Sequence, residues 1–439
     1  MINRSDYPAD FLFGTATSAY QIEGHKFGGA GSTHWDSFAA TPGNVMGLGN
    51  GQLACDHYHR FEEDLDLVAA AGFDTYRFST SWARIIPDGV GSVNQQGLDF
   101  YDRLTDAMLE RGLKPAATLY HWEMPSALED RGGWRNSDIA KLFGDFTEVV
   151  MACIGDRMFS VAPINEPWCV GWLSHFEGVH APGLRDIRAT SRAMHHVLCA
   201  HGTAIARMRA LGIKNLGAVC NFEYANPIDN EPENCAAAAR YDAIYNRFFM
   251  GGIFNKAYPD LVLEGIEPFL PKRWQDDFDL IGVPIDWCGI NYYTRSNLGH
   301  KEGAWPNIQA YEGSLDKTEM GWEIYSDGLF DFIMRTHQEY TLGMPIYVTE
   351  NGMANDDFVK NGVVNDDARL EYISAHLLAV LKAVKQGVPL AGYYVWSLLD
   401  NYEWSLGYEK RFGLVHVDFE TQKRTPKKSY LELKKALKC

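Results

Sequence analysis

Short apolar runs alternate with longer amphipathic stretches along the whole chain. Apolar runs bounded by turn residues are typical of buried strands, and they predict strands at residues 12–15, 75–79, 115–119, 160–164, 216–222, 287–292, 346–349 and 392–396. Between these runs, apolar residues recur at helical spacing, most clearly over residues 97–111 and 366–386. We expect Asp366 to cap the second of these helices and Gly387 to end it.

The eight alternations of strand and helix predict an α/β protein, and we expect a single (β/α)8 TIM barrel domain over residues 1–439. A doubly wound open sheet alternates in the same way, so the pattern by itself leaves both folds open. The longest irregular stretches are residues 26–56, 170–190 and 295–325, and they are rich in Gly, Trp, Tyr and His. We expect these stretches to be elaborated loops that wall an active-site pocket.

Composition narrows the class of protein. With 46% hydrophobic residues the chain can bury a large core without disulfides, and its eight cysteines show neither disulfide nor metal-ligand spacing. We therefore expect free, mostly buried thiols in a reducing compartment, with Cys169 as inert core filling. We expect no metal and no cofactor.

Charge and hydropathy bear on partners and location. A net charge of −17 argues against a nucleic-acid partner, which would need a basic face. No stretch approaches the roughly 20 apolar residues of a membrane span, and no apolar leader follows Met1, so we expect a cytoplasmic protein without a membrane partner. Lysines alternate with leucines near the C-terminus, where we expect the solvated face of a final helix. These lysines are Lys427, Lys428, Lys434, Lys435 and Lys438.

Two glutamates carry the clearest chemistry. Glu166 follows the predicted strand 160–164 inside an Asn-Glu-Pro run, and Glu350 follows the predicted strand 346–349 inside a Thr-Glu-Asn-Gly run. Two carboxyl groups at strand ends can cleave a glycosidic bond with retention, one protonating the leaving oxygen and the other attacking the anomeric carbon. Each run alone is a weak signal, because Asn-Glu-Pro also starts helices and turns.

Further polar and aromatic residues follow the predicted strands. The strands of a barrel end on one face, where amides, carboxylates and imidazoles can bind sugar hydroxyls and indoles can cover the C–H surface of a sugar. These residues are Gln21, Arg77, His121, Trp122, Asn165, Asn291, Tyr293, Trp396, Glu403 and Trp404. His57 and His59 lack a third ligand at metal-binding spacing, so we interpret them as structural.

The motifs recur in a fixed order along the chain. They are Phe-Leu-Phe-Gly-Thr-Ala-Thr-Ser-Ala-Tyr-Gln-Ile-Glu-Gly at 11–24, Tyr-Arg-Phe-Ser-Thr-Ser-Trp at 76–82, Leu-Tyr-His-Trp at 119–122, Asn-Glu-Pro at 165–167, Gly-Ile-Asn-Tyr-Tyr-Thr at 289–294, Tyr-Val-Thr-Glu-Asn-Gly at 347–352, Trp-Ser-Leu-Leu-Asp-Asn-Tyr-Glu-Trp at 396–404 and Arg-Phe-Gly-Leu-Val at 411–415. In this order they resemble glycoside hydrolase family 1, the β-glucosidases and β-galactosidases, from end to end. The resemblance implies the barrel rather than the open sheet.

By this resemblance Glu350 is the nucleophile and Glu166 the general acid/base. The residues expected to support them are Arg77, Asn165, Asn291 and Tyr293. Arg77 and Tyr293 are expected to keep Glu350 ionised, and the charge of Glu350 is expected to raise the pKa of Glu166.

The resemblance also assigns the walls of the pocket. The expected substrate-binding residues are Gln21, His121, Trp122, Asn165, Trp396, Glu403, Trp404 and Phe412. The residues expected on the aglycone side are Trp168, Leu173 and Trp322.

The implied activity is that of a retaining exo-β-glycosidase, a β-glucosidase acting on cellobiose, short β-glucosides and aryl glucosides, with side activity on β-fucosides and β-galactosides. Glu403 and Trp404 argue against a phospho-β-glycosidase, and Glu166 argues against a myrosinase. The alternatives are a transglycosylating enzyme that prefers galactosides or fucosides, and a catalytically silent sugar-binding relative. The sequence leaves the preferred sugar and the oligomeric state open.

Overall fold

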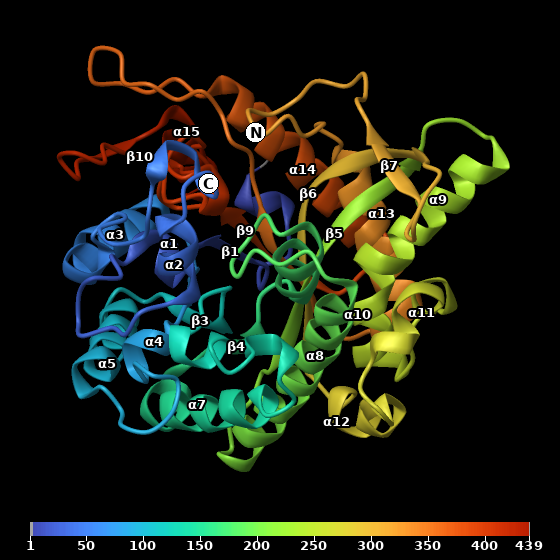
Figure 1. Ribbon diagram of the computed structural model, residues 1–439. Helices are drawn as coiled ribbons and strands as arrows, with labels where there is room; N and C mark the ends of the chain where they lie inside the picture. Colours follow the sequence, from blue (N-terminus) through green and yellow to red (C-terminus); the bar gives the residue numbers. More distant parts are fainter. Residues whose placement is uncertain (1–2, 439) are drawn as a thin grey trace.

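The computed structural model describes residues 3–438 and forms a ring of strands wrapped by helices (Figure 1). Every strand expected from the sequence is present. The strands are β1 Leu12–Ala16, β2 Thr75–Ser79, β3 Lys114–Tyr120, β4 Ser160–Ile164, β5 Gly217–Pro227, β6 Trp287–His300, β7 Ile308–Tyr311, β8 Ile346–Asn351, β9 Leu390–Trp396, β10 Val415–Val417 and β11 Arg424–Pro426.

Eight parallel strands form the barrel wall. They follow the order β4-β3-β2-β1-β9-β8-β6-β5, and β1 pairs with β9, so the two ends of the chain share one sheet. Two parallel bridges, Val161 to Leu216 and Asn165 to Val219, join the remaining edges at β4 and β5. The closed (β/α)8 barrel is therefore confirmed, and the open sheet is excluded.

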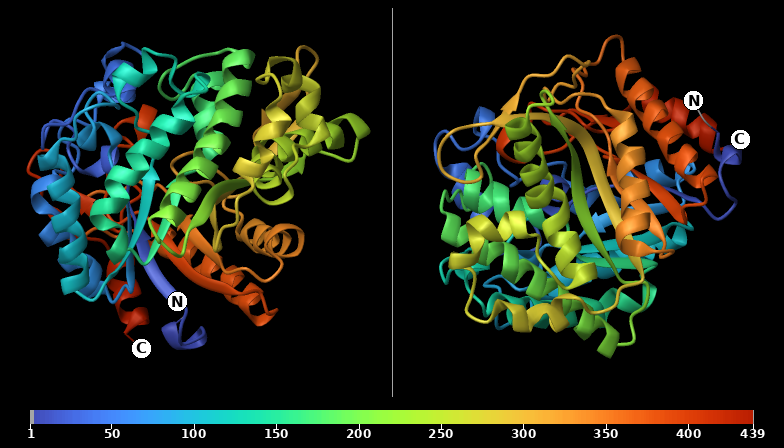
Figure 2. Two further views of the ribbon diagram at one scale, coloured as in Figure 1. Left: turned by 90° about the horizontal axis from the view of Figure 1, so that it is seen from below. Right: turned by 90° about the vertical axis from the view of Figure 1, so that its right-hand side faces the viewer.

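Helices cover the outside of the barrel in both views of Figure 2. The α-helices are α1 Ala19–Ile22, α2 His34–Ala40, α3 His57–Ala71, α4 Trp82–Ile85, α5 Gln95–Glu110, α6 Ser126–Glu129, α7 Ile139–Ile154, α8 Ile187–Ala210, α9 Pro232–Asp242, α10 Phe248–Met250, α11 Asp260–Ile266, α12 Phe278–Ile281, α13 Ser326–Thr336, α14 Asp367–Lys385 and α15 Lys428–Leu437. The two termini lie side by side, and the Arg4 guanidinium donates to the Leu437 carbonyl at 3.0 Å. Among residues 3–438, no helix combines the length and the apolar character needed to cross a membrane.

Alternation along each strand separates the barrel interior from the helical layer. On β2, Tyr76 and Phe78 belong to the large core between strands and helices, while Thr75 and Arg77 point inward. The Thr75 hydroxyl lies 3.2 Å from the hydroxyl of Tyr394 on β9. Successive side chains of a strand face opposite ways, so one short strand serves both the core and the site.

Three stretches expected to be irregular loops contain regular structure. β6 continues to His300 and pairs with β7 in an antiparallel hairpin within residues 295–325. A π-helix, η5 Cys169–Glu177, lies in the second stretch, and α2 lies in the first. The expected lack of regular structure was wrong, because aromatic and polar side chains mask the apolar period on which it relied. The expected role as pocket walls is met by Leu173, His180, Met320 and Trp322, which line a cavity.

Helix α14 begins and ends close to the expected positions. It is followed by Gly387, whose φ of +86° is readily adopted by glycine. The capping role expected for Asp366 is wrong. Its carboxylate accepts hydrogen bonds from the Ser429 backbone N–H at 2.8 Å and from the Arg369 guanidinium, because this buried cation needs a paired charge.

The final helix α15 is present, but the first lysine of the basic run is not solvated. Lys427 is fully buried, and its ammonium lies 2.5 Å from Asp357 and 2.6 Å from Asp400. Lys428, the next residue, is exposed and pairs with Asp367 at the surface. The expectation for Lys427 was wrong because burial depends on which segments pack over a side chain.

Candidate active site

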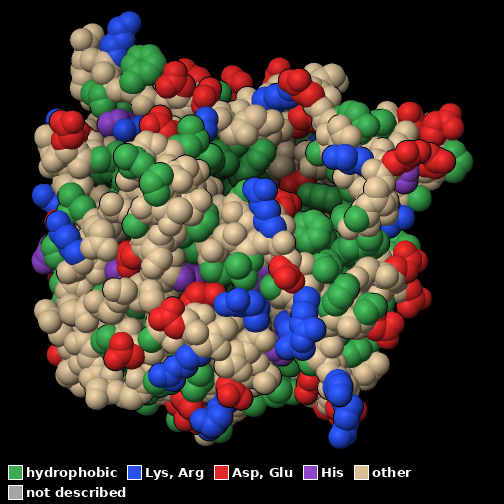
Figure 3. All heavy atoms as spheres, viewed as in Figure 1, with side chains coloured by type: hydrophobic (Ala, Val, Ile, Leu, Met, Phe, Trp, Pro, Cys, Tyr) green, Lys and Arg blue, Asp and Glu red, His purple; other side chains and the backbone are tan. Residues whose placement is uncertain are grey.

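A cavity of about 320 Å³ opens at the end of the barrel where the parallel strands finish. Figure 3 shows hydrophobic side chains gathered beside a hollow in the face of the molecule that it presents. The residues that line the cavity are His121, Trp122, Glu166, Trp168, Cys169, Leu173, His180, Asn221, Glu223, Tyr245, Tyr293, Met320, Trp322, Glu350, Trp396, Glu403, Trp404, Ser405, Leu406 and Phe412. Most residues expected from the sequence are among them, while Gln21, Arg77, Asn165 and Asn291 are buried beside this lining.

Glu166 stands at the point where the barrel closes. Its backbone N–H donates to the Val219 carbonyl on β5 at 3.1 Å, directly after the bridge that links Asn165 to the same residue. Its φ of +48° lies in the left-handed region, as do those of Trp122 and Trp404 in the same wall. Such backbone strain in residues other than glycine gathers at functional sites, where the surrounding structure holds it in place.

Both oxygens of the Glu166 carboxyl have partners. The Asn291 amide donates to Oε1 at 2.7 Å, and the Cys169 thiol donates to Oε2 at 3.1 Å. The expectation that Cys169 is inert core filling is therefore wrong, since its sulfur reaches the pocket from the first turn of η5. The signal in the sequence was the spacing of three residues, which brings the two side chains together because a helical turn follows Glu166, with the Cys169 N–H donating to the Glu166 carbonyl at 3.0 Å.

Glu350 has a different set of partners. Arg77, whose side chain is buried inside the barrel, pairs with Oε1, and the Tyr293 hydroxyl donates to Oε2 at 2.6 Å. These are the two neighbours that the sequence predicts for Glu350. A guanidinium and a phenol both favour an ionised carboxyl.

A chain of hydrogen bonds connects the surroundings of the two carboxyls. Arg77 donates to the side-chain oxygen of Asn165 at 2.7 Å, and Asn291 donates to the same oxygen at 3.1 Å while also contacting Glu166. The Thr349 hydroxyl in turn donates to the Asn291 oxygen at 2.6 Å. These donors identify the oxygen of each amide and so fix the orientation of the Asn165 and Asn291 side chains.

The surroundings of the two carboxyls affect their pKa values differently. Burial, followed by the charge of Glu350, raises the pKa of Glu166 to about 8. Burial also raises the pKa of Glu350, but Arg77 and Tyr293 oppose that rise. A shared proton therefore belongs on Glu166, as expected, although burial contributes more to its pKa than the neighbouring charge.

His121 shows one unused hydrogen-bond donor. The Asn165 amide lies 3.1 Å from Nε2 of His121, and the oxygen of that amide is already occupied, so the amide donates and the imidazole carries its proton on Nδ1. Nδ1 has no partner, and burial holds the pKa of this histidine well below its usual value. The ring stacks on Trp396 and Trp404, with centroids 5.6 and 6.1 Å apart.

Glu403 also faces the cavity, whereas Gln21 lies behind it. Gln21 accepts from Ser18 at 2.6 Å and donates to Asn401, to the Tyr402 carbonyl and to Glu403, the last at 3.4 Å. Burial and the two other pocket carboxyls raise the pKa of Glu403 to about 8. Direct sugar contact by Gln21 remains a prediction, and in this structure Gln21 orients Glu403.

The expected aglycone side is aromatic, and it contains residues that the sequence analysis missed. Trp168 stacks on Tyr245 at 4.0 Å, and Trp322 packs between Tyr293 and Phe412. Additional residues on the cavity wall are Asn221, Glu223, Tyr245, His180, Met320, Ser405 and Leu406. The strand-end rule could have found Asn221 and Glu223, since both lie on β5 at the end of the strand predicted over residues 216–222. Tyr245 lies in a π-helix, η6 Ala243–Arg247, far from any strand end, and had no such signal.

Comparisons with known proteins agree with this geometry. The chain is 44% identical to beta-glucosidase A of Thermotoga maritima over 98% of this chain and 97% of that protein. It is 44% identical to a beta-glucosidase of Agrobacterium sp. over 96% and 93%, respectively. It is 39% identical to a bifunctional beta-D-glucosidase/beta-D-fucosidase of Bifidobacterium breve over 97% and 96%.

The solved structures agree as well. The family 1 β-glucosidase from Thermotoga maritima superposes with a TM-score of 0.96 at 42% identity, covering 98% of each chain. A complex of that enzyme with isofagomine lactam superposes with a TM-score of 0.95 at the same identity and coverage. The model of glycosyl hydrolase family 1 matches residues 3–438. With this match and a closed barrel carrying both carboxyls in one pocket, the chain belongs to glycosyl hydrolase family 1.

Proposed function

We propose that this chain is a retaining β-glucosidase that removes terminal non-reducing β-D-glucosyl residues from cellobiose, short β-glucosides and aryl glucosides. One observation carries the proposal: Glu166 and Glu350 line the same cavity with different partners. Glu350 contacts a guanidinium, whereas Glu166 contacts an amide and a thiol. Two carboxyls held in different protonation states are what double displacement needs.

In the first step Glu350 attacks the anomeric carbon. A bond forms between its carboxylate oxygen and that carbon as the bond to the leaving oxygen breaks, and Glu166 gives its proton to the leaving oxygen. The charge of Glu350 is consumed in the ester, which removes one of the two causes that raise the pKa of Glu166. In the second step Glu166 accepts a proton from water as the water oxygen bonds to the same carbon, and the ester bond to Glu350 breaks, which restores the Glu350 carboxylate and releases the sugar.

The pocket shape supports cleavage at a chain end. His121, Trp396 and Trp404 form a stacked aromatic wall, and Glu403 adds an acceptor for sugar hydroxyls. His121 lines the cavity and is expected to bind a hydroxyl of the sugar. Sugar binding by Gln21, Trp122, Asn165 and Phe412 belongs to the same proposal.

Side activity on β-fucosides and β-galactosides is part of this proposal. The relative from Bifidobacterium breve is named as both a glucosidase and a fucosidase. Transfer to a sugar or alcohol acceptor is a second candidate activity, favoured by the aromatic surfaces of Trp168 and Trp322 at the aglycone side. Such surfaces can bind an acceptor in competition with water.

The test is a panel of p-nitrophenyl β-glycosides together with cellobiose, ranked by kcat/KM. We expect the glucoside and the fucoside to be cleaved with retention and the 6-phosphoglucoside to be a poor substrate. Absence of release from every β-glycoside contradicts the proposal. Addition of an alcohol acceptor, with glucoside products measured by chromatography, tests the transfer activity.

The domain organisation and the cellular location of the protein are proposed as well. A single domain over residues 1–439 is supported by the pairing of β1 with β9, which unites both ends of the chain. A cytoplasmic location and a role in cellulose breakdown, through cellobiose, are proposed as well. The location is supported by the seven cysteines within residues 3–438, which are free and of which five are buried.

A further inference from the structure

Three side chains outside the active-site cavity bring an imidazole, a thiol and a carboxylate together. His195 and Cys199 lie one turn apart on α8, and Asp277 ends the 3₁₀ helix η9 Trp274–Asp277, which leads into α12. Nε2 of His195 lies 3.0 Å from Oδ2 of Asp277 and 3.5 Å from Sγ of Cys199. Among residues 3–438, this is the one group of three such residues whose ligand atoms lie within 4.8 Å of one another.

These separations fit a tetrahedral metal ion. Zinc binds nitrogen and oxygen at about 2.0–2.2 Å and sulfur at about 2.3 Å, which places neighbouring ligand atoms about 3.2–3.7 Å apart. The separation of 3.5 Å between Nε2 and Sγ lies within this range, and the separation of 3.0 Å between Nε2 and Oδ2 is a few tenths of an ångström below it. Residues four apart on a helix present their side chains on one face, so α8 supplies two of the ligands without rearrangement.

The surroundings orient the three ligands. The Tyr258 hydroxyl lies 2.8 Å from Nδ1 of His195 and so directs Nε2 toward Cys199 and Asp277. Tyr258 also stacks on Trp274, the first residue of η9, with ring centroids 5.2 Å apart, which ties the segment that carries Asp277 to the histidine. A partner on the second ring nitrogen is the usual support of a histidine that binds a metal.

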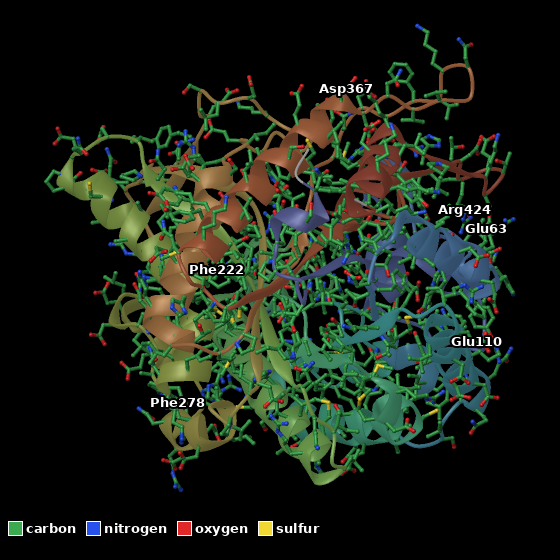
Figure 4. The ribbon with its side chains drawn as sticks, turned by 180° about the vertical axis from the view of Figure 1, so that it is seen from behind. Glu63, Glu110, Phe222, Phe278, Asp367 and Arg424 are labelled. Atoms are coloured by element: carbon green, nitrogen blue, oxygen red, sulfur yellow. The ribbon has the colours of Figure 1, made fainter. Side chains whose placement is uncertain are left out.

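The cluster is reachable from solvent at one side. His195 is fully buried and Cys199 is 7% exposed, but the side chain of Asp277 is 45% exposed. Figure 4 shows Phe278, the residue after Asp277, at the edge of the molecule, whereas Phe222 of β5 lies nearer its centre. An ion can therefore enter beside Asp277, and water can take the fourth position.

We propose that His195, Cys199 and Asp277 bind one zinc ion. On binding, Cys199 releases its thiol proton to solvent as the sulfur–zinc bond forms, and thiolate and carboxylate balance the double positive charge. A thiolate and an imidazole favour zinc over magnesium or calcium, which prefer oxygen ligands. This site differs from the expectation of no metal. His195 and Cys199 form a site only once Asp277, 82 positions after His195, completes it.

The ion links α8 to residues 274–277 on the outside of the barrel. None of the three ligands lines the active-site cavity. Zinc therefore stabilises the folded state by binding to it and takes no part in glycoside cleavage. The expected consequences are a higher thermal midpoint in zinc and unchanged hydrolysis.

The test uses the full chain without an affinity tag, freed of metal with EDTA and titrated with cobalt(II). We expect a thiolate-to-cobalt charge-transfer band that saturates at one ion per chain and is abolished by zinc. Cys199→Ser and Asp277→Asn should each weaken zinc affinity by more than about 100-fold, since even the outer partners of metal ligands are worth about 10–100-fold.

Matched controls come from the same chain. Cys235→Ser alters an exposed cysteine, and Asp276→Asn alters the acidic neighbour of Asp277. Both should keep the band and the zinc-dependent rise in thermal midpoint. Absence of the band in the wild type, or an equal band in Cys199→Ser, overturns the proposal. If Cys199→Ser fails to fold by circular dichroism, Asp277→Asn decides, because that side chain is half exposed.

Discussion

The thiol of Cys169 lies 3.1 Å from Oε2 of Glu166, so a cysteine donates a hydrogen bond to one of the two pocket carboxyls. The Asn221 amide lies 3.6 Å from the same sulfur and points the thiol proton toward Glu166. This hydrogen bond favours the ionised form of the carboxyl and so lowers its pKa, against the larger effect of burial. Cys169 is thus placed to tune the proposed general acid.

Cys169→Ala should raise the pKa of Glu166, because a bond to the charged form is lost. A general acid works when protonated, so kcat/KM falls as pH rises through its pKa, which is about 8 here. The variant should move this basic limb upward by up to about one pH unit, since one hydrogen bond is worth about 0.5–1.5 kcal/mol. Cys288→Ala, in the buried core, is the control. An unmoved limb in Cys169→Ala refutes the tuning role.

Glu166→Gln should slow poor leaving groups most. Loss of the acid should lower kcat/KM for cellobiose by about 10²–10⁴-fold, because its leaving oxygen needs a proton. The loss should be smaller for p-nitrophenyl glucoside, whose leaving group departs without one. The measurement is kcat/KM for both substrates. Equal slowing would show that Glu166 is not the proton donor.

Tyr293→Phe should move the acidic limb of the pH profile to higher pH. The Tyr293 hydroxyl donates to Glu350 at 2.6 Å and lowers the pKa of that carboxyl, so its loss raises the pKa. The proposed nucleophile must be ionised, and activity therefore appears at a higher pH. Tyr292→Phe is the matched control, because the hydroxyl of Tyr292 donates to the Tyr325 carbonyl instead. A shift of equal size in both variants would argue against the assignment.

Leu173→Ala should make the enzyme more sensitive to free glucose. Trp168 and Leu173 both line the cavity, and Trp168 is held by stacking on Tyr245, so the pair narrows the aglycone side. We expect the glucose inhibition constant to fall several-fold when the leucine is truncated. Leu406→Ala, which alters another leucine of the cavity lining, controls for a general effect. The hypothesis does not survive an unchanged inhibition constant in Leu173→Ala.

Lys427→Ala should destabilise the fold strongly. Its ammonium is fully buried between Asp357 and Asp400, and removing one partner of a buried ion pair costs about 3–5 kcal/mol. Lys428→Ala should change the thermal midpoint little, because that lysine pairs with Asp367 at the surface. Calorimetry measures the thermal midpoints of the two variants. Similar midpoints would contradict the predicted importance of the buried Lys427.

Local chemistry was readable from the sequence because it depends on neighbours along the chain. β2 and β4 have the expected bounds, since a buried parallel strand is a short apolar run between turn residues. Glu166 and Glu350 were placed because a barrel brings its strand ends to one face. The surroundings of Glu350 followed from the ordered motifs, and the structure places Arg77 and Tyr293 beside it.

The tertiary structure decided what depends on residues far apart in sequence. Whether Lys427 is solvated depends on what packs over it, and its two aspartates come from other loops. The sulfur of Cys169 receives the amide of Asn221, 52 positions away, only because barrel closure joins the β4 edge to β5. His195 gains an acidic neighbour 82 positions away only once α8 packs against the segment before α12. The amino-acid pattern thus determined the elements and the two carboxyls, while barrel closure determined their neighbours, because burial and contact arise only when separate segments meet.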